Sequence, residues 1–510
     1  MIRTPLNLAP IKSCHTVLLE AIPVLAMDDF MQTILDSVAA SLRVVSLFGV
    51  ASPPLETTTL YVVLADDEQN QLFVGRTEVK GDRFPSLTPR CPQVHLFERE
   101  IAEQFGLIPL GHPWLKPLRY HHAWTVRDAW GRDQKQTVLP AVGDFYRVEG
   151  EQVHEVAVGP VHAGVIEPGH FRFQCHGEQV FRLEIALGFQ HRGIEQAMLG
   201  GPTKRSLPYA ETLAGDTTIA HAASYCQIVE ALGNCRKTAR AEALSSIALE
   251  LERLANHVGD LGALAGDVGF LPAASFCGRI RGEFLNMTAL LCGNRFGRGL
   301  LQPGGVAFDM DEERVAILLH QLAVAERDTT IAVELLWDTQ SVMARFVGTG
   351  PLPRQMAVDL GIVGPVARAS GLTRDVRCDQ PSGIFRLAQI PVSTYDSGDV
   401  FGRAFVRWLE IQRSLAFIRE QLQSIPTGEL LTRLDALSPS CLAISLNEGW
   451  RGEVCHVALT DEQSRFSRYK IVDPSFHNWL GLAYAMRNQG ISDFPLCNKS
   501  FNLSYCGHDL

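Results

Sequence analysis

Hydrophobic and polar residues alternate with a period of two through residues 42–74, as in the stretch TTTLYVVLAD. This alternation is typical of β-strands that have one buried face. Helical spacing follows, and Gly106 supplies a stop signal. The apolar residues that recur every four positions in this helix are Phe97, Ile101 and Phe105. Strands followed by a helix predict a small α+β domain over residues 1–140.

A polar, turn-rich stretch, DAWGRDQKQTVLPAVGDFYRVEGE, separates this domain from the rest of the chain. Strand-like residues resume near residue 155, and the middle of the chain is then helical. In residues 237–266 the apolar positions lie alternately three and four residues apart, which places them on one stripe of a buried helix. The pattern predicts an α+β chain whose second domain, residues 151–510, is a large helical bundle with peripheral β-strands.

A second face of this long helix is charged. Glu250, Arg253 and His257 lie at positions i, i+3 and i+7, so they share one side of the helix. Two interpretations remain open at this point. The three residues form either an ion-paired helix face or a buried functional network.

The composition and the charge narrow the class of protein. The chain has 510 residues, of which 46% are hydrophobic and 20% are charged, so we expect several globular domains. The formal net charge of −10 argues against a nucleic-acid-binding protein, which would carry a basic surface. No run approaches 18 apolar residues, and the N-terminal residues show no signal-peptide pattern. We therefore expect a cytosolic chain that can still dock on a membrane protein.

The cysteines give no sign of a cluster site. There are 12 of them, and no two are spaced as C-x-x-C. Zinc and iron–sulfur sites usually draw their thiolates from such close pairs. In a reducing compartment we expect most of these cysteines to be small buried residues.

Six segments, in a fixed order along the chain, carry a resemblance to a known family. They are VGPVHAGVIEPGHFRF, FQHRGIE, ELERLANHVGDLG, GGV at residues 304–306, ARASGLTRDVR and SGDVFGR. Together they resemble the large subunit of group 4 membrane-bound NiFe hydrogenases and the related 49-kDa-type subunit of respiratory complex I. The earlier segments FEREIAEQFGL and GHP resemble the 30-kDa-type subunit of complex I, which is fused in front in formate-hydrogenlyase-type large subunits. The resemblance covers residues 40–510 and implies the fold of that family.

The resemblance implies a metal site that this sequence has lost. Active hydrogenases of the family hold nickel and iron with two C-x-x-C pairs, because soft thiolates suit such a centre and can bridge its metals. The four cysteine positions of the family fall on Ala214, Thr217, Ser475 and Asn478. Loss of one supporting partner already weakens a metal site by about 10–100-fold. We therefore expect no NiFe centre and no metal ligands in this chain.

Other polar residues near these positions are candidates for the lining of the same cavity. Asp216, Asp473 and His477 are the candidates for holding a different metal, although a lone histidine beside Asp-Pro is more often structural. The resemblance adds Arg192 and His221 to the cavity lining. These residues are expected to shape the cavity and not to ligate a metal.

The C-terminal stretch VDPSFHNW is either a plain buried turn or the frame of a site. In maturing hydrogenases of the family the segment after the last cysteine motif is removed. Here 32 residues follow Asn478, and the sequence offers no nickel ligands that would trigger removal. We expect this tail to stay and to pack into the core, where it fills part of the vacated cavity.

The complex I relative uses the same cavity to bind a quinone. A histidine and a tyrosine there donate hydrogen bonds or protons to the quinone carbonyls, which suits two-electron, two-proton reduction. His162 and His170 are the candidates for the histidine, and each has the alternative role of capping a β-turn. The tyrosine position falls on Gly215, so that donor is missing, and Asp216 is the remaining candidate for proton chemistry.

Arginines in the matched segments supply further charge. They are Arg192, Arg279, Arg281, Arg368, Arg374 and Arg377. Some basic residues of the family border the cavity or a neighbouring iron–sulfur cluster. Because buried guanidinium groups must be paired, Glu195, Glu283 and Asp375 are expected as partners. We expect structural pairing for most of these arginines.

The resemblance implies an oxidoreductase subunit that acts only within a complex. We expect an iron–sulfur small subunit that carries a 4Fe-4S cluster, antiporter-like and anchor subunits in the membrane, and a quinone or another acceptor. The chain would lie on the cytoplasmic face of the membrane and would bind no cofactor of its own. The alternative is a non-catalytic scaffold that couples conformational change to the membrane arm, and an active hydrogenase is the least favoured interpretation.

Overall fold

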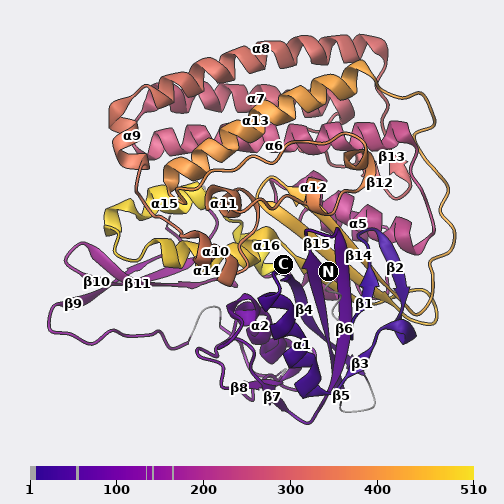
Figure 1. Cartoon of the computed structure of the whole chain (residues 1–510), viewed down its shortest axis with the longest axis vertical. Coiled ribbons are helices and arrows are strands. Elements are labelled where there is room, and N and C mark those ends of the chain that lie inside the picture. Colours follow the sequence, from indigo (N-terminus) through magenta and orange to yellow (C-terminus); the bar gives the residue numbers. More distant parts are fainter. Residues whose placement is uncertain (1–6, 53–56, 134, 140–142, 163–165) are drawn as a thin grey trace.

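The computed structural model describes residues 7–52, 57–133, 135–139, 143–162 and 166–510. Figure 1 shows an α+β architecture, as the sequence predicts: an N-terminal sheet with its helices, a second sheet in the interior, and a layer of long helices. None of the helices among these residues combines the length and the apolar character that crossing a bilayer requires. The expected domain boundaries at residues 140 and 151 stay predictions.

The N-terminal part is built on a sheet in the order β1-β6-β5-β4, with β3 parallel to β6. Its strands are β1 (Ala9–Ile11), β3 (Val24–Leu25), β4 (Arg43–Ser52), β5 (Thr57–Asp66) and β6 (Gln71–Lys80). The helices α1 (Met27–Ala39) and α2 (His95–Phe105) accompany it. Helix α2 ends at Gly106, which has a φ of 71° and thus the left-handed conformation that glycine adopts readily. The expected helix stop is confirmed.

Four long helices form the outer layer at the top of Figure 1. They are α6 (Ala239–Asp267), α7 (Leu271–Cys292), α8 (Glu312–Trp337) and α13 (Val400–Gln423). Three of them begin at side-chain N-caps, in which Thr238, Asp311 and Asp399 each accept a hydrogen bond from a first-turn N–H. Capping and a buried apolar stripe together explain why these segments are helical.

A second sheet lies in the interior of the molecule. It consists of β16 (Phe466–Val472), β15 (Gly452–Thr460), β14 (Cys441–Gly449) and β2 (His15–Leu18), in that order. Every residue of β14 and β15 is buried. Alternate residues face two different cores, since Leu442 and Ile444 pack with the N-terminal part whereas Ala443 packs with the helices. This sheet is therefore a shared wall between two cores, whereas the sequence led us to expect only peripheral strands in the second domain.

Shorter elements complete the fold. The strands β9 (Val153–Val158), β10 (His170–His176) and β11 (Gln179–Ala186) form an antiparallel sheet in the order β11-β10-β9. The remaining strands are β7 (Arg83–Pro85), β8 (Ile108–Leu110), β12 (Leu301–Gln302) and β13 (Gly305–Val306). The remaining helices before the C-terminal part are α3 (Ile194–Ala197), α4 (Ser206–Glu211), α5 (Thr218–Leu232), α9 (Gln340–Phe346), α10 (Arg354–Asp359), α11 (Gly364–Ala369) and α12 (Val376–Asp379).

The C-terminal part ends with three helices, of which the last, α16, lies beside the C mark of Figure 1. They are α14 (Pro474–Ala485), α15 (Phe494–Phe501) and α16 (Tyr505–Asp509). The stretch VDPSFHNW thus begins a helix and is not a plain turn. Asp473 is the N-cap of α14 and accepts a hydrogen bond from the Ser475 N–H, while Pro474 occupies the first helical position, where no N–H is needed.

Candidate functional site

The four positions that correspond to lost cysteines lie at the starts of two helices. Ala214 and Thr217 precede α5, and Thr217 is the N-cap residue of that helix. Ser475 and Asn478 lie in the first turn of α14. All four side chains are completely buried. The four positions therefore mark two helix starts within the protein interior.

Two of these side chains are held by the surrounding chain. The Asn478 amide donates to the Val363 carbonyl and accepts from the Val363 N–H, each over 3.0 Å. The Ser475 hydroxyl accepts a hydrogen bond from the Ser504 N–H over 2.8 Å. Both residues are thus used to fix neighbouring backbone segments.

The other side of the site is held by an ion pair. Arg451 binds both carboxylate oxygens of Asp216 over 2.5 Å and 2.8 Å, and it also donates to the Thr217 hydroxyl over 3.1 Å. Its guanidinium lies 3.9 Å from the ring centre of Trp450. Burial opposes the ionisation of Asp216, but the positive charge of Arg451 outweighs burial and keeps the pKa of Asp216 below its usual range. Asp216 is therefore a carboxylate with a dedicated partner.

A chain of hydrogen bonds leads from the Asp-Pro frame into the interior. Asp473 lies 3.0 Å from His221, whose other ring nitrogen lies 3.1 Å from His456, and His456 lies 2.9 Å from the Tyr469 hydroxyl. Burial lowers the pKa of His456 well below its usual value. With neutral rings, one tautomer assignment lets every donor point toward Asp473. The arrangement can hold and move a proton along four side chains.

The C-terminal tail closes the site from one side. Its Asp509 carboxylate accepts hydrogen bonds from the N–H groups of Gly188 and Gln190 over 2.9 Å and 2.8 Å. At Gly507 a Cβ atom would lie only 2.6 Å from the Asp473 carboxyl carbon, so glycine is needed for this close approach. The expectation that the tail packs into the core is confirmed.

The two candidate quinone-binding histidines lie apart from this closed site. His162 is half-buried, with its ring 5.5 Å from that of Phe171 and 6.2 Å from that of Tyr505. His170 is the first residue of β10 and packs on Phe145 at 5.3 Å. Among the described residues, no hydrogen bond joins either histidine to the Asp216 or Asp473 groups. Sequence reasoning placed them near one cavity, and that placement stays a prediction, although His162 packs against Tyr505 of the helix that closes the site.

Two other candidate residues, Arg192 and His477, hold or pack against neighbouring parts of the chain. Arg192 donates to the carbonyls of Thr212 and Leu213 over 2.7 Å and 2.8 Å, and it thereby holds the loop before Ala214. His477 is buried edge-on against Phe97 of the N-terminal part, with the ring centres 5.8 Å apart. Burial lowers the pKa of His477 to about 3, which keeps this imidazole neutral.

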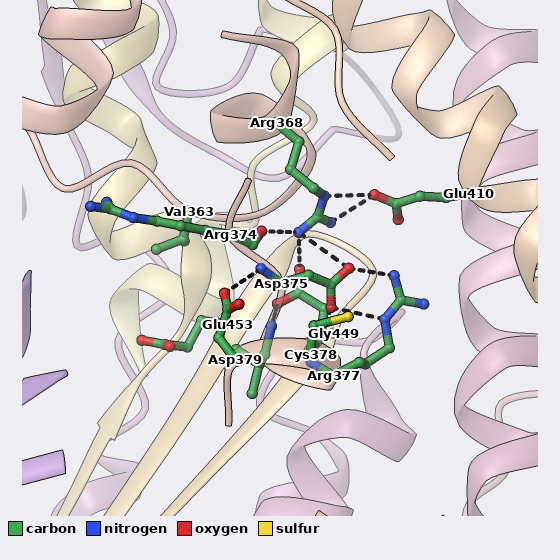
Figure 2. Close-up of polar contacts among 12 residues, drawn as sticks. Val363, Arg368, Arg374, Asp375, Arg377, Cys378, Asp379, Glu410, Gly449 and Glu453 are labelled. Atoms are coloured by element: carbon green, nitrogen blue, oxygen red, sulfur yellow. Dashed lines mark hydrogen bonds and ion pairs between the residues drawn. The ribbon is translucent and has the colours of Figure 1, made fainter. Parts of the chain in front are cut away.

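Two of these arginines, Arg368 and Arg377, meet in one buried charge network, part of which is drawn in Figure 2. Arg368 lies 2.7 Å from Glu410 and 2.8 Å from Glu448. Arg377 binds Asp375 over 2.6 Å and 2.9 Å, as the sequence led us to expect. The network supplies each guanidinium with carboxylates in the low-dielectric interior, which is the condition for burying such a charge.

The charged face of α6 belongs to the same network. Glu250, Arg253 and His257 are completely buried, and Arg253 pairs with Glu250 on the same helix, so this face is both ion-paired and buried. A functional role of the network stays a prediction. Arg253 also donates to the backbone carbonyls of Glu448 and Gly449 over 2.6 Å and 3.1 Å. The network thereby fixes the end of β14, directly before the turn that carries Arg451.

Of the two remaining acids that were expected to pair with these arginines, one does so and the other does not. Arg279 lies on the surface, 3.6 Å from Glu283 as expected. Glu195, in contrast, binds Arg468 and Lys470 of β16, each over 3.0 Å, and not an arginine of the matched segments. No local pattern could predict this pairing, since the partners lie more than 270 residues apart.

One acidic residue near the site was missed. Glu252 of α6 accepts hydrogen bonds from the N–H groups of Ile219 and Ala220 over 2.7 Å and 3.3 Å, at the start of α5. Burial raises the pKa of Glu252 to about 8. Its carboxyl borders a crevice of about 10 Å³ beside Asp216, which has room for little more than one water molecule. The helical stripe of α6 alone could not reveal this contact with another helix.

Comparison with known proteins identifies the family. The family model of the respiratory-chain NADH dehydrogenase 49 Kd subunit matches residues 267–440, and that of the 30 Kd subunit matches residues 23–135. Hydrogenase-4 component G of Escherichia coli (strain K12) is 30% identical over 464 residues, which cover 87% of this chain and 79% of that protein. The chain belongs to the family of group 4 hydrogenase large subunits and complex I 49-kDa-type subunits.

Two further relatives are, by their names, also a hydrogenase or a formate hydrogenlyase subunit. Formate hydrogenlyase subunit 5 of Escherichia coli (strain K12) is 29% identical over 462 residues, covering 88% of this chain and 81% of the relative. The carbon monoxide-induced hydrogenase of Rhodospirillum rubrum is 30% identical over 350 residues, which cover 68% of this chain and 97% of that protein. The resemblance that six short segments indicated is confirmed.

The NiFe centre of hydrogenases in this family does not fit the residues present. A methyl group, two hydroxyls and an amide stand at the four ligand positions, and the amide and one hydroxyl bind backbone groups. None of these is a soft, anionic ligand that could bridge two metals. In the described part of the chain, no group of three or more His, Cys, Asp or Glu side chains is arranged to hold a metal ion.

Proposed function

We propose that this chain is the core peripheral subunit of a membrane-bound, ion-translocating oxidoreductase complex related to complex I and group 4 hydrogenases, and that it works without a NiFe centre. One observation carries the proposal. The Asp473–His221 frame of the family site is intact and hydrogen-bonded, while the four thiolate positions hold uncharged side chains. The scaffold is retained although the metal chemistry is not.

In this proposal a partner subunit with a 4Fe-4S cluster supplies electrons, and a quinone or another acceptor takes them up. The family membership supports partner subunits of this kind, because the relatives include an NADH-quinone oxidoreductase subunit of Dehalococcoides mccartyi. The Nε2 atom of His162 and the hydroxyl of Tyr505 are buried and have no hydrogen-bond partner among the described residues. Two such donors suit an acceptor that carries carbonyl oxygens.

A specific observation favours a second candidate, the coupling scaffold. The His221 ring and the side chains at the four family ligand positions are completely buried, and Arg451 is paired with Asp216 beside them, so the described residues around His221 form a closed polar site. A buried and fully paired polar site can transmit a shift between the helices and the interior sheet without any chemistry of its own.

Purification of the complex from the native membrane tests both candidates. For the oxidoreductase we expect reduction of a short-chain quinone analogue by a chemically reduced complex, with negligible nickel by elemental analysis. His162→Ala should lower this rate at least tenfold and His176→Ala, at the exposed last residue of β10, should not. Turnover unaffected by His162→Ala contradicts the acceptor site, and a complex that lacks turnover altogether favours the scaffold. Stoichiometric nickel overturns the proposal.

A further inference from the structure

A mainly apolar cavity lies between the N-terminal part and the second domain, away from the family site. Its volume is about 680 Å³, within the range of small-molecule sites. One wall is a face of α2 with His95, Leu96 and Arg99, and the opposite wall is formed by β11 and by Leu480 and Ala483 of α14. The loop of residues 113–120 covers it, and aromatic rings of this loop contribute to the lining.

Arg99 is a buried cation without an ionic partner. Only 7% of the residue is exposed, and its guanidinium donates to the carbonyls of Lys116 and Pro117 over 2.9 Å and 2.7 Å. No carboxylate of the described residues lies within ion-pair distance of it. Burial lowers the pKa of Arg99, which shows the cost of leaving this charge without a counterion.

The neighbouring acids are all engaged elsewhere. Glu98 of α2 accepts from Ser86, Leu87 and Thr88, and Glu103 accepts from the N–H groups of Leu118, Arg119 and Tyr120. Glu100 binds Lys470 over 2.7 Å and pairs with Arg119. Each carboxylate of this helix therefore has its own donors, and none turns toward Arg99.

Glu184, the acid that lines the cavity, is also engaged. It pairs with Lys116 and accepts from the Trp114 indole over 2.8 Å and from the Tyr146 N–H over 3.0 Å. Arg182 adds a further cation to the lining, with its guanidinium 4.0 Å from the ring centre of Tyr146. Among the described residues, three cations thus face one acid around the cavity, and the surplus is positive.

A hydroxyl without a hydrogen-bond partner lines the same space. The hydroxyl of Tyr120 is buried and has no hydrogen-bond partner among the described residues, and the residue is 6% exposed. An unpaired cation and an unpaired hydroxyl both require an acceptor. The cavity also presents apolar side chains, namely Leu96, Leu480 and Ala483, which favour an apolar group beside that acceptor. An acceptor-rich anionic head on an apolar chain satisfies both demands.

We propose that this cavity binds one amphipathic anion, a molecule with a carboxylate or phosphate head for Arg99 and an apolar chain for the α14 wall. The site is independent of the acceptor site proposed above, because it lies on the α2 face of β11 and involves neither His162 nor the Asp473–His221 frame. Binding at the interdomain cavity would stabilise the contact between the N-terminal part and the second domain.

Calorimetric titration of the full-length chain tests the site with three ligands: decanoate, decyl phosphate and the neutral ester methyl decanoate. We expect one molecule of decanoate or decyl phosphate per chain, the better of the two identifying the head, and at least tenfold weaker binding of the ester. Arg99→Met, which keeps the volume and removes the charge, should weaken anion binding at least tenfold. Arg83→Met, at an exposed arginine outside the cavity, should change it less than twofold.

Ala483→Trp supplies a second test, because it fills the α14 wall and leaves Arg99 in place. We expect loss of decanoate binding in a variant whose circular dichroism matches that of the wild type. Equal affinity of wild type and Arg99→Met, or an ester that binds as tightly as decanoate, overturns the proposal. Binding by the free chain that disappears in the assembled complex also overturns it, because the cavity would then receive a segment of a partner subunit.

Discussion

Two carboxylates at the start of α5 differ in protonation because their donors differ. Asp216 has the guanidinium of Arg451, which keeps its pKa low in spite of burial. Glu252 has only two backbone N–H donors and no cation in contact among the described residues, so burial prevails and raises its pKa to about 8. The same short segment therefore combines an ionised acid with one that is protonated near neutral pH.

Glu252→Gln should change how stability depends on pH. The folded pKa of about 8 lies above the ordinary value of 4.5, so the contribution of Glu252 to stability is fully present below pH 4.5 and is lost as the pH rises to about 8. Glutamine cannot ionise, and each pKa unit corresponds to about 1.4 kcal/mol. We expect the variant to gain about 4–5 kcal/mol relative to wild type between pH 4.5 and pH 8.5 in urea unfolding.

Glu313→Gln, at an exposed position of α8, is the control and should show no such trend. A difference between Glu252→Gln and wild type that stays constant over this pH range contradicts the assignment.

At the scale of elements, α16 closes the site through backbone contacts. The Asp509 carboxylate is fully buried and caps two N–H groups that follow β11, while the Leu510 carbonyl accepts from the N–H groups of Arg192 and Gly193. These contacts join the last helix to the loop that holds Ala214 through Arg192. The tail is thus part of the scaffold of the site.

Asp509→Ala should destabilise the protein by about 2–4 kcal/mol, because two buried N–H groups lose their acceptor at about 1–3 kcal/mol each. Denaturant unfolding measures this change, and limited proteolysis should show faster cleavage after residue 486. Asp509→Asn keeps one acceptor and should cost less. Asp435→Ala, at an exposed aspartate, should stay within about 0.5 kcal/mol of wild type. A tail variant as stable as this control would show that the contacts contribute nothing.

At the scale of the whole molecule, the N-terminal part shares its core with the interior sheet. Leu442, Ile444 and Leu446 of β14 pack into the N-terminal core, and Phe476 of α14 lies 4.9 Å from Phe97 between ring centres. Strand β2 belongs to the N-terminal sequence but pairs with β14. The two parts are therefore joined by a common core and not only by a linker.

A fragment of residues 1–140 should fail to fold cooperatively when expressed alone. It would expose the core face that β14 covers and would leave β2 without its partner strand, which removes hydrophobic burial and ladder hydrogen bonds. Thermal unfolding followed by circular dichroism should show a broad transition in the fragment and a sharp one in the full-length chain. A fragment with a sharp transition at the temperature of the full chain contradicts the shared core.

Sequence alone was enough to establish the family, the α+β class, the long helices and the loss of the thiolate ligands. These features depend on local periodicity or on the identity of single residues, such as the Phe97–Phe105 spacing and the serine at position 475. The burial of the tail also followed, since the missing nickel ligands predicted that it stays. That the four positions lie at two helix starts, and which partners they have, became known only from the structure.

What each charge contacts, in contrast, was settled by tertiary packing. Arg451, Glu252, Glu410 and Glu448 carry no sequence signal of burial, because a charged residue is expected to be exposed until its distant partner is known. The interior sheet was missed because two cores cover its two faces, and the separation of His170 from Asp473 depends on how the small sheet packs. Interactions between residues hundreds of positions apart arise from packing, which no periodicity of two or 3.6 residues encodes.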